Sequence, residues 1–565
     1  MSHVTTRRPP LLRALISSLP RLGYAGSRSA LLHVDPGEDP ETTARDRHLG
    51  IRELNRFQLL RWIGTIGALL IGLGALGAGA LPVLGNPYSS FPGGFFVARM
   101  LQTSSVMVLV GVGLLVLAWV LMAPFVGASY RGGSISGPTV TRSLIKRTFA
   151  AWVLPILFTA PLFTQDIYSY LAQGSIVARG MDPYSAGPVD LLGPEDPLAR
   201  SVPFIWSHSP SPYGPVALGI ASAISRVTAD SITLGVIAHR LVSLLGLIAA
   251  GWAISRLARR CRVNPVTALW LGMLNPLTIL HLIGGIHNES VLLGLMLVGL
   301  EVGLRGVDKL GGRNGQPVDP AGGAGLIVLS ALLIGGAGLV KVTGFLALGF
   351  VGMNLARHFL RVGRGPVVSL VLAVLVQVTL LVATIALITV VTGIGLGWVT
   401  GQGGAATIRS WLSMTTNIGV SAGFVGMLLG LGDHTTTMLF ITRGVGVLVA
   451  VGFLVRFLFA TYRGTIHPVG GLGVATFVLV ILFPVVHPWY MLWAILPLAA
   501  WANRTFFRVS VVAYSAFFSF TVLPRGLALP ASTVASIYLG ATVVFVAVVT
   551  LGWWLMRRGT IRGLH

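Results

Sequence analysis

The chain has 565 residues, of which 54% are hydrophobic and only 10% are charged, and its mean hydropathy is +0.82. Roughly a quarter of the residues of soluble domains are charged, so this composition excludes a soluble globular protein. A membrane-crossing helix needs about 20 apolar residues, and the length therefore allows on the order of a dozen crossings in one integral unit. Cys261 is the single cysteine, which excludes an internal disulfide and a metal cluster built from cysteines.

The first 58 residues differ from the rest of the chain. They contain nine Arg and six acidic residues, and Arg13 and Pro20 interrupt their apolar stretches. A secretory signal peptide has an unbroken apolar core, so this segment is not one. We predict that 1–58 is a mobile cytoplasmic tail and that 59–565 forms a single membrane domain.

The membrane domain contains fourteen apolar runs, and we predict a spanning helix in each. They lie near 63–81, 104–126, 148–163, 236–256, 266–284, 290–304, 325–340, 343–356, 367–392, 438–455, 468–485, 488–502, 509–523 and 531–555. Two further runs, 214–228 and 417–431, are short and rich in small residues, and we interpret them as re-entrant helices. The predicted fold is therefore all-α, a polytopic integral membrane protein with about 14 to 16 transmembrane helices.

The net charge of +23 raises the question of nucleic-acid binding. With the tail placed inside, however, 30 of the 40 Lys and Arg residues fall in the tail or in alternate connections on the same side. This pattern follows the positive-inside rule, so the basic excess indicates topology and contact with membrane lipids, with no nucleic acid as partner. We predict a multi-pass protein of the plasma membrane with both termini in the cytoplasm.

The first large loop on the predicted outside, residues 165–213, concentrates acidic residues. Five of the 17 acidic residues of the chain fall within 31 residues of this loop: Asp166, Asp182, Asp190, Glu195 and Asp196. Long loops held by a rigid scaffold often carry chemistry. We therefore interpret 165–213 as a catalytic loop.

Asp166 is the leading candidate for catalysis, because it directly follows an apolar run and so lies at the membrane surface. A carboxylate in that place can meet a lipid-borne substrate and take a proton from an attacking hydroxyl as a general base. The alternative is that Asp166 caps the following helix, 167–179, and the two roles are compatible.

Other polar and aromatic residues of the loop are candidates for contact with a sugar or an acceptor. Asp182 precedes Pro183, so a turn is the first explanation and substrate contact the second. Asp190, Glu195 and Asp196 alternate with prolines, which is typical of a solvated loop. Aromatic and imidazole rings of the loop suit sugar faces or an interfacial belt; these are Tyr168, Tyr170, Tyr184, Trp206, His208 and Tyr213.

Three groups from other outside turns could complete a site. His287, Asn288 and Glu289 lie together in one turn, and hydrogen bonding to a hydroxylated substrate is favoured over metal binding, since no third donor has metal spacing. Lys341 ends an apolar run, where snorkelling to the interface is the alternative to a functional role. The segment 487–490 joins two spans and brings His487, Trp489 and Tyr490. With Arg409 and Arg443, the cations Lys341 and His487 could hold a phosphate. The sequence indicates no metal and no cofactor.

The order and sidedness of these motifs resemble the GT-C superfamily of polyprenol-phosphate-sugar glycosyltransferases. More narrowly, they resemble the α-1,6-mannosyltransferases that build lipomannan and the lipoarabinomannan core, at 165–170, 180–184, 211–215, 274–276 with 287–289, and 487–490. The resemblance covers most of the chain after about residue 60. It places the catalytic acid of the family at Asp166, but a second acid beside it, found in some relatives, is absent here.

The resemblance implies an inverting enzyme that transfers mannose from a polyprenyl-phosphate-mannose donor to the 6-hydroxyl of a mannan glycolipid at the outer face of the membrane. Two alternatives remain open from sequence. One is a GT-C arabinofuranosyltransferase with a related lipid donor. The other is a lipid-linked saccharide flippase, which would need ionisable groups along a transport pathway. Because the acidic residues cluster at one surface, the sequence favours an enzyme.

Overall fold

The computed structural model describes residues 50–128, 130, 138–312, 317–400 and 408–558, and within these ranges the regular secondary structure is entirely helical. Eight of the described helices are long and apolar enough to cross a membrane. They are α4 (Ile51–Ala78), α6 (Leu101–Leu121), α13 (Ile232–Arg260), α15 (Glu289–Leu310), α16 (Pro320–Gly338), α18 (Pro366–Thr392), α21 (Thr435–Arg463) and α25 (Ala531–Arg557). The predicted class, an all-α polytopic membrane protein, is confirmed.

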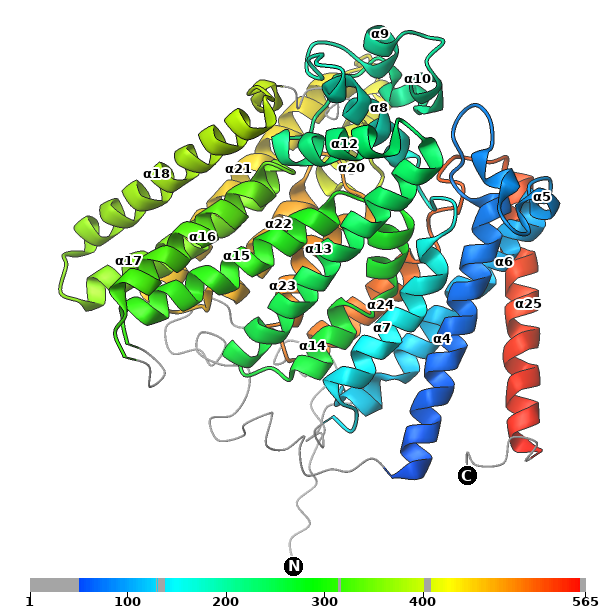
Figure 1. Cartoon of the computed structure of the whole chain (residues 1–565), viewed down its shortest axis with the longest axis horizontal. Helices are drawn as coiled ribbons and strands as arrows, with labels where there is room; N and C mark the ends of the chain where they lie inside the picture. The colour runs from blue at the N-terminus through cyan, green and yellow to red at the C-terminus, as the bar shows by residue number, and fades with distance from the viewer. Residues whose placement is uncertain (1–49, 129, 131–137, 313–316, 401–407, 559–565) are drawn as a thin grey trace, which may run out of the picture.

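Shorter helices complete the bundle: α7 (Arg142–Leu157), α14 (Pro265–Gly272), α17 (Leu346–Arg361), α22 (Pro468–Leu482), α23 (Leu492–Ala499) and α24 (Thr505–Phe518). The two runs interpreted as re-entrant form α12 (Pro215–Thr228) and α20 (Met414–Leu428). At 1.5 Å per residue, α12 is roughly 21 Å long, shorter than a hydrocarbon core of about 30 Å. In Figure 1 it lies across the ends of the longer helices. The total number of crossings stays a prediction.

The predicted span 266–284 is broken in the structure. Helix α14 ends at Gly272, and a separate π-helical segment, η3 (Thr278–Gly284), follows. Pro276 cannot donate a backbone hydrogen bond. At the break, the Asn275 side chain replaces a backbone acceptor, because its Oδ1 accepts from the Leu277 N–H at 3.0 Å. Asn275 Nδ2 donates to Ser515 Oγ of α24 at 2.8 Å, which ties the break to another helix.

Small and aromatic residues bring the N-terminal helices into close contact. A Cβ atom on Gly67 of α4 would lie 2.6 Å from the carbonyl oxygen of Gly111 in α6, so the two backbones touch where only glycine fits. Trp119 of α6 and Trp270 of α14 each donate an indole N–H to the other's carbonyl oxygen, both at 2.9 Å. These contacts hold α4, α6 and α14 in fixed register.

The two ends of the bundle differ in character. The start of α4 and the end of α25 lie at one end, and the helices of the large loop gather at the opposite end (Figure 1). We name the first the basic end, because the last turns of α13, α15, α17 and α21 carry Arg259, Arg260, Lys309, Arg361 and Arg463. We name the second the loop end. Residues 1–49 of the predicted tail lie outside the described residues, and 51–58 already belong to α4.

Candidate active site

The large loop is itself folded. It contains α8 (Asp166–Ala178), α9 (Pro188–Leu192), α10 (Pro197–Ser201) and α11 (Phe204–Ser207), and it continues into α12. Asp230, which follows α12, accepts hydrogen bonds from Ser175 Oγ at 2.8 Å and Ser225 Oγ, and it pairs with Arg179 at 3.2 Å. Asp230 therefore links the end of α8 to the end of α12.

Four of the five acidic residues of the loop have structural partners within it. Asp182 Oδ1 accepts from the Tyr184 N–H at 2.9 Å, as expected of the predicted turn. Asp190 pairs with His208 Nδ1 at 2.8 Å, and Glu195 pairs with Arg200 at 3.5 Å. Asp196 caps α10 and pairs with Arg179 at 3.0 Å. These carboxylates stabilise the loop, and none of these contacts involves the residues gathered around Asp166.

Asp166 is the first residue of α8, and its carboxylate faces other elements. The indole N–H of Trp206 donates to Asp166 Oδ1 at 3.3 Å, and His287 Nδ1 lies 3.8 Å from Oδ2. The N-cap position is occupied by Gln165, without a side-chain cap bond. Trp206 thus orients Oδ1, and the Asp166 side chain as a whole is 28% exposed.

Imidazole rings stack around one indole beside Asp166. Trp489 lies in the short helix η6 (Pro488–Met491), and its ring centroid is 4.1 Å from that of His287 and 4.5 Å from that of His487, both nearly parallel. Burial lowers the pKa of His487 to about 4 and also lowers the pKa of His287. At neutral pH both rings are uncharged, and each can donate or accept a hydrogen bond.

An ion pair lies on the other side of this stack. Lys341 Nζ is 2.8 Å from Glu289 Oε1 and donates to Tyr490 OH at 3.0 Å, and the ammonium lies 4.2 Å from the Tyr490 ring centroid. Burial alone would lower the pKa of Lys341, but the Glu289 carboxylate together with the Tyr490 and Tyr213 hydroxyls outweighs it and holds that pKa above the usual value. Lys341 is thus a fixed cation with one of its three N–H donors left over.

Tyrosines of the large loop lie on one side of the residues gathered around Asp166. Tyr213 OH donates to Tyr170 OH at 3.3 Å, and Tyr184 OH donates to the Tyr213 carbonyl at 2.9 Å. The following residue, Gly214, packs so closely on Leu339 that a Cβ atom there would lie 2.2 Å from the Leu339 carbonyl oxygen. Glycine is required at this approach, which brings the end of the loop beside the Lys341 segment.

Arg443 of α21 is linked by hydrogen bonds to the segment that precedes His487. Arg443 donates to the Ile408 carbonyl at 2.8 Å and to Thr416 Oγ1 at 3.1 Å. Thr416 Oγ1 in turn donates to the Pro484 carbonyl at 2.7 Å, and Ser410 Oγ donates to the Val486 carbonyl. Arg443 is thus linked through Thr416 to the 484–487 segment, and Arg409 is exposed one residue before Ser410.

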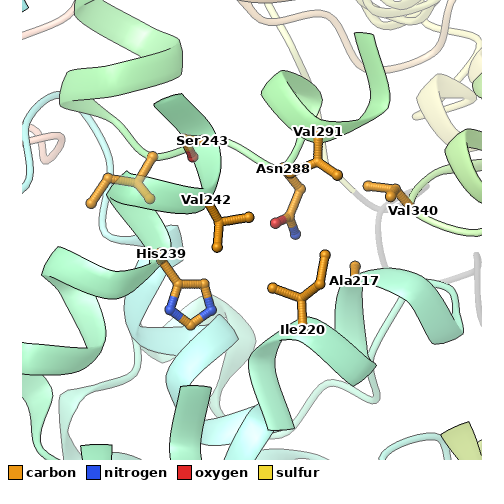
Figure 2. Close-up of a pocket in the computed structure, with 9 residues that line it drawn as sticks. Ala217, Ile220, His239, Val242, Ser243, Asn288, Val291 and Val340 are labelled. Atoms are coloured by element: carbon orange, nitrogen blue, oxygen red, sulfur yellow. The ribbon is translucent and has the colours of Figure 1, made fainter. Parts of the chain in front are cut away.

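Three candidate residues point away from this cluster. Tyr168 is fully buried and its hydroxyl donates to the Ala80 carbonyl at 2.8 Å. His208 is held by Asp190 at the exposed face of the loop. Asn288 points into a small separate pocket beside His239 and Val340 (Figure 2), with a volume of about 10 Å³, enough for roughly one water molecule.

Sequence reasoning did not single out Arg240. This residue links the segment before Asp166 to the segment before His287. This buried guanidinium donates to the carbonyls of Leu157, Thr159 and Ala160 before Asp166, and to that of Ile283 before His287, at 2.7–3.3 Å. Both segments then pass through a residue in the left-handed region, Phe163 at φ 68° and Ile286 at φ 56°. A β-branched residue there is strained, and such strain clusters at functional sites.

Two buried donor atoms of the cluster have no hydrogen-bond partner within the described part of the chain, His287 Nε2 and Trp489 Nε1. In the same residues, no group of three His, Cys, Asp or Glu side chains is arranged to hold a metal ion. Unpaired polar atoms in an otherwise packed site point to a hydrogen-bonding substrate. We name the group formed by Asp166, Trp206, His287, Glu289, Lys341, His487, Trp489 and Tyr490 the loop-end cluster.

A helical membrane bundle with a carboxylate, neutral imidazoles and a fixed cation collected under a folded loop defines a membrane-embedded enzyme. The family model described as "Alpha-(1->6)-mannopyranosyltransferase, N-terminal domain" matches residues 61–357, and the one described as "MptB C-terminal domain" matches 415–550. The chain belongs to the α-(1→6)-mannopyranosyltransferase family and is a glycosyltransferase of the MptB-like type, which confirms the resemblance found in the sequence.

Several curated proteins are similar to the chain. Alpha-(1->6)-mannopyranosyltransferase B of Corynebacterium glutamicum is 61% identical over 99% of this chain and 95% of its own length. Alpha-(1->6)-mannopyranosyltransferase Rv1459c of Mycobacterium tuberculosis is 40% identical over 81% of each chain. Alpha-(1->6)-mannopyranosyltransferase A of the same organism is 32% identical over 80% of this chain and 81% of its own. No solved structure matches the chain.

Proposed function

We propose that the protein transfers mannose from a polyprenyl-phosphate-mannose lipid to the 6-hydroxyl of a mannan glycolipid, extending the backbone of lipomannan and the lipoarabinomannan core. The names of its relatives support α-(1→6)-mannosyl transfer. A single displacement with inversion at the anomeric carbon needs one general base and a stabilised leaving group. The loop-end cluster contains side chains suited to both roles.

Asp166 is the general base in this proposal, and its geometry carries the assignment. Trp206 fixes Oδ1, so Oδ2 is free to accept the proton of the acceptor hydroxyl. As that proton leaves, the acceptor oxygen attacks the anomeric carbon, and the bond from this carbon to the phosphate oxygen breaks. The electron pair of the broken bond stays with the polyprenyl phosphate, and no covalent enzyme intermediate forms.

Lys341 is the first candidate for holding the leaving phosphate, because its third N–H is not used by Glu289 or Tyr490. His487 would add a neutral hydrogen-bond donor rather than a second charge. Arg443, which is linked through Thr416 to the segment before His487, and the exposed Arg409 complete the set of candidate phosphate ligands. Fixed donors of this kind stabilise charge that develops on the leaving group.

The sugar ring would lie against Trp206, since Trp489 is already stacked with His287 and His487, and Tyr490 is stacked with Trp493 and lies under the Lys341 ammonium. His287 Nε2 and Trp489 Nε1, which have no partner within the described residues, are placed to bond sugar hydroxyls. Tyr184 and Tyr213 lie further along the loop and suit the acceptor chain, whereas Tyr170 is buried in a hydrophobic cluster.

We propose that the reaction needs no metal or other cofactor, because the second carboxylate of the cluster is already neutralised. Glu289 is paired with Lys341, which leaves Asp166 as a single carboxylate oxygen donor, whereas hard cations take several oxygen ligands. We also propose that the loop end faces outward from the plasma membrane and that both termini are cytoplasmic. The basic end of the bundle supports this orientation through the positive-inside rule.

The experiment that tests this function is transfer from labelled donors in membranes containing Asp166→Asn. We expect folding and lipid binding to be kept and transfer to fall by about 10²- to 10⁴-fold, as for loss of a general base. Glu195→Gln is the matched control, because this loop carboxylate is 90% exposed and pairs only with Arg200 at the surface. Near-normal transfer by Asp166→Asn would refute the assignment, and transfer of labelled arabinofuranose by the wild type would refute the donor.

A further inference from the structure

A small pocket adjoins the Glu289–Lys341 ion pair of the loop-end cluster. Its volume is about 10 Å³, and its lining includes the residues directly before the two partners of this pair, Asn288 and Val340. The rest of the lining is aliphatic apart from two polar residues of α13, and no Asp or Glu of the described residues lines the pocket. A group bound here would therefore contact segments that carry the site.

One of the polar residues of α13, His239, has a buried nitrogen atom without a partner. The residue is 5% exposed, and its Nδ1 lies 2.9 Å from the Gly235 carbonyl oxygen of the preceding turn. Because a carbonyl oxygen only accepts, Nδ1 carries the proton, and Nε2 of the neutral ring is a hydrogen-bond acceptor. Nε2 has no partner within the described part of the chain. A nitrogen atom buried in this way needs a donor, which a ligand of the pocket can supply.

Two further polar side chains border the same space. In Figure 2 the Asn288 amide projects from the turn before α15 into the pocket, across from the His239 ring. Ser243 follows His239 at a spacing of four residues, on the same face of α13, and it also lines the pocket. A buried water molecule typically makes about three hydrogen bonds, and a volume of this size accommodates roughly one such molecule. The pocket thus matches water both in size and in its number of polar groups.

We propose that one structural water molecule binds in this pocket, donates a hydrogen bond to His239 Nε2 and bonds to the Asn288 amide, and that His239 is thereby a positioning residue for the site. Asn288 is the middle residue of the turn that carries His287 and Glu289, and both of these belong to the loop-end cluster. Holding Asn288 therefore holds its two neighbours. The positioning role rests on the proposed function, whereas the water site does not.

The backbone before Asn288 explains why the turn needs a second attachment to α13. Arg240, the neighbour of His239, donates to the Ile283 carbonyl at 3.1 Å, so α13 holds the stretch before the turn directly. Ile286 lies between Ile283 and Asn288 at φ 56°, where a β-branched residue is strained. Such strain persists only when the surroundings hold it in place. Arg240 holds the chain on one side of the strained residue, and the water molecule holds it on the other.

A cryo-EM map of the full-length protein in nanodiscs, at a resolution that shows ordered water, tests the water site. We expect a density peak at about 2.7–3.2 Å from both His239 Nε2 and the Asn288 amide. The peak should be absent from His239→Leu/Asn288→Leu, because an apolar pocket of this size stays dry. A wild-type pocket without density, or a direct hydrogen bond between the two side chains, would overturn the proposal.

The thermal stability of the same variants tests the bridge without any transfer reaction. His239→Leu and Asn288→Leu should each lower the apparent melting temperature, because each leaves the opposite polar group without its partner. The double variant should lose less than the sum of the two single losses. His434→Leu is the control for loss of an imidazole, since His434 is exposed, and it should change neither stability nor kcat. Additive losses would mean that no water molecule couples the two side chains.

The kinetics of mannosyl transfer test the positioning role. His239→Leu should lower kcat about 10-fold at an unchanged KM, because a small displacement of the turn is costly. His239→Gln should recover most of kcat, since its side-chain amide places an acceptor near the position of Nε2. Equal losses in the two variants, or a rise in KM in place of the fall in kcat, would overturn the positioning role. If the wild type transferred no mannose, the proposed function would fail, while the map and the stability measurements would still decide the water site.

Discussion

His287 Nδ1 and Asp166 Oδ2 are 3.8 Å apart, which is beyond hydrogen-bonding distance and leaves the carboxylate oxygen open on that side. Each residue follows a segment that is fixed by Arg240 and then turned by a residue with positive φ. The gap between them is therefore set by the backbone. It gives an incoming hydroxyl a place between the base and a neutral imidazole.

Trp206→Phe should lower kcat about 10-fold, because it removes the hydrogen bond by which the indole orients Asp166, and a bond to a charged group contributes roughly 1.5–3 kcal/mol. The steady-state kinetics of mannosyl transfer in membranes measure this. Trp62→Phe serves as the control, since Trp62 is 57% exposed on α4. An unchanged kcat in Trp206→Phe would mean that the indole does not orient the base.

Glu289→Gln and Lys341→Met should each destabilise the protein by about 3 to 5 kcal/mol, because each leaves a buried charge without its partner. The double variant should recover much of the lost stability and yet remain inactive, since the fixed cation is gone. Apparent melting temperatures and transfer rates of the four proteins form a double-mutant cycle. Additive losses of stability would contradict the pairing, and an active double variant would contradict the role of Lys341.

Lowering the pH from 6.5 to 5 should destabilise the protein through His487. Its pKa is about 4 in the folded chain against 6.5 ordinarily, so the unfolded chain takes up a proton first as the pH falls. The contribution of neutral His487 to the free energy of unfolding is fully present above pH 6.5 and is lost as the pH falls toward 4. The loss is on the order of 2 kcal/mol by pH 5. His487→Gln should show a shallower fall in melting temperature, and part of the remaining fall should come from His287, whose pKa is lowered too. An equally steep fall in the variant would exclude His487 as a source.

Arg240→Lys should reduce kcat by about 10²-fold while changing KM little, because lysine cannot bridge the four carbonyls and a small displacement of the base is costly. Arg200→Lys, at an exposed position of the loop, should have no effect. Arg240→Met should be worse than Arg240→Lys, since it leaves the carbonyls without any donor. If KM rose in proportion instead, Arg240 would be acting on substrate binding rather than on the position of Asp166.

The fold class could be predicted because hydrophobicity over about 20 residues is a local signal, and it marked all eight long helices. The break in the predicted span 266–284 was harder to predict from the sequence, although Asn275 and Pro276 lie at its centre. Apolar character continues through the break, so the span appears unbroken unless proline is given priority over hydropathy.

The members of the site were easier to predict than their partners. Asp166, Glu289 and Lys341 were each selected as ionisable groups near the membrane surface, but the pairing of Glu289 with Lys341 depends on how α15 packs against the segment between α16 and α17. Tyr168 points inward because it is two residues after Asp166, while Tyr170 shares the face of Asp166 at a spacing of four. Arg240 stood within the apolar run 236–256, where an ionisable residue should have drawn attention.

The contact between Gly214 and Leu339 also limits how the enzyme can work over time. The Val216 N–H donates to the Leu339 carbonyl at 3.1 Å, so the end of the loop and the segment before Lys341 form one rigid unit. A lid that lifted away would carry Lys341 with it and, under the proposed role of this lysine, would dismantle the site at every turnover. Under the proposed function, the acceptor glycan and the donor lipid would therefore enter without the loop lifting away, and their lateral movement would set the pace of chain growth.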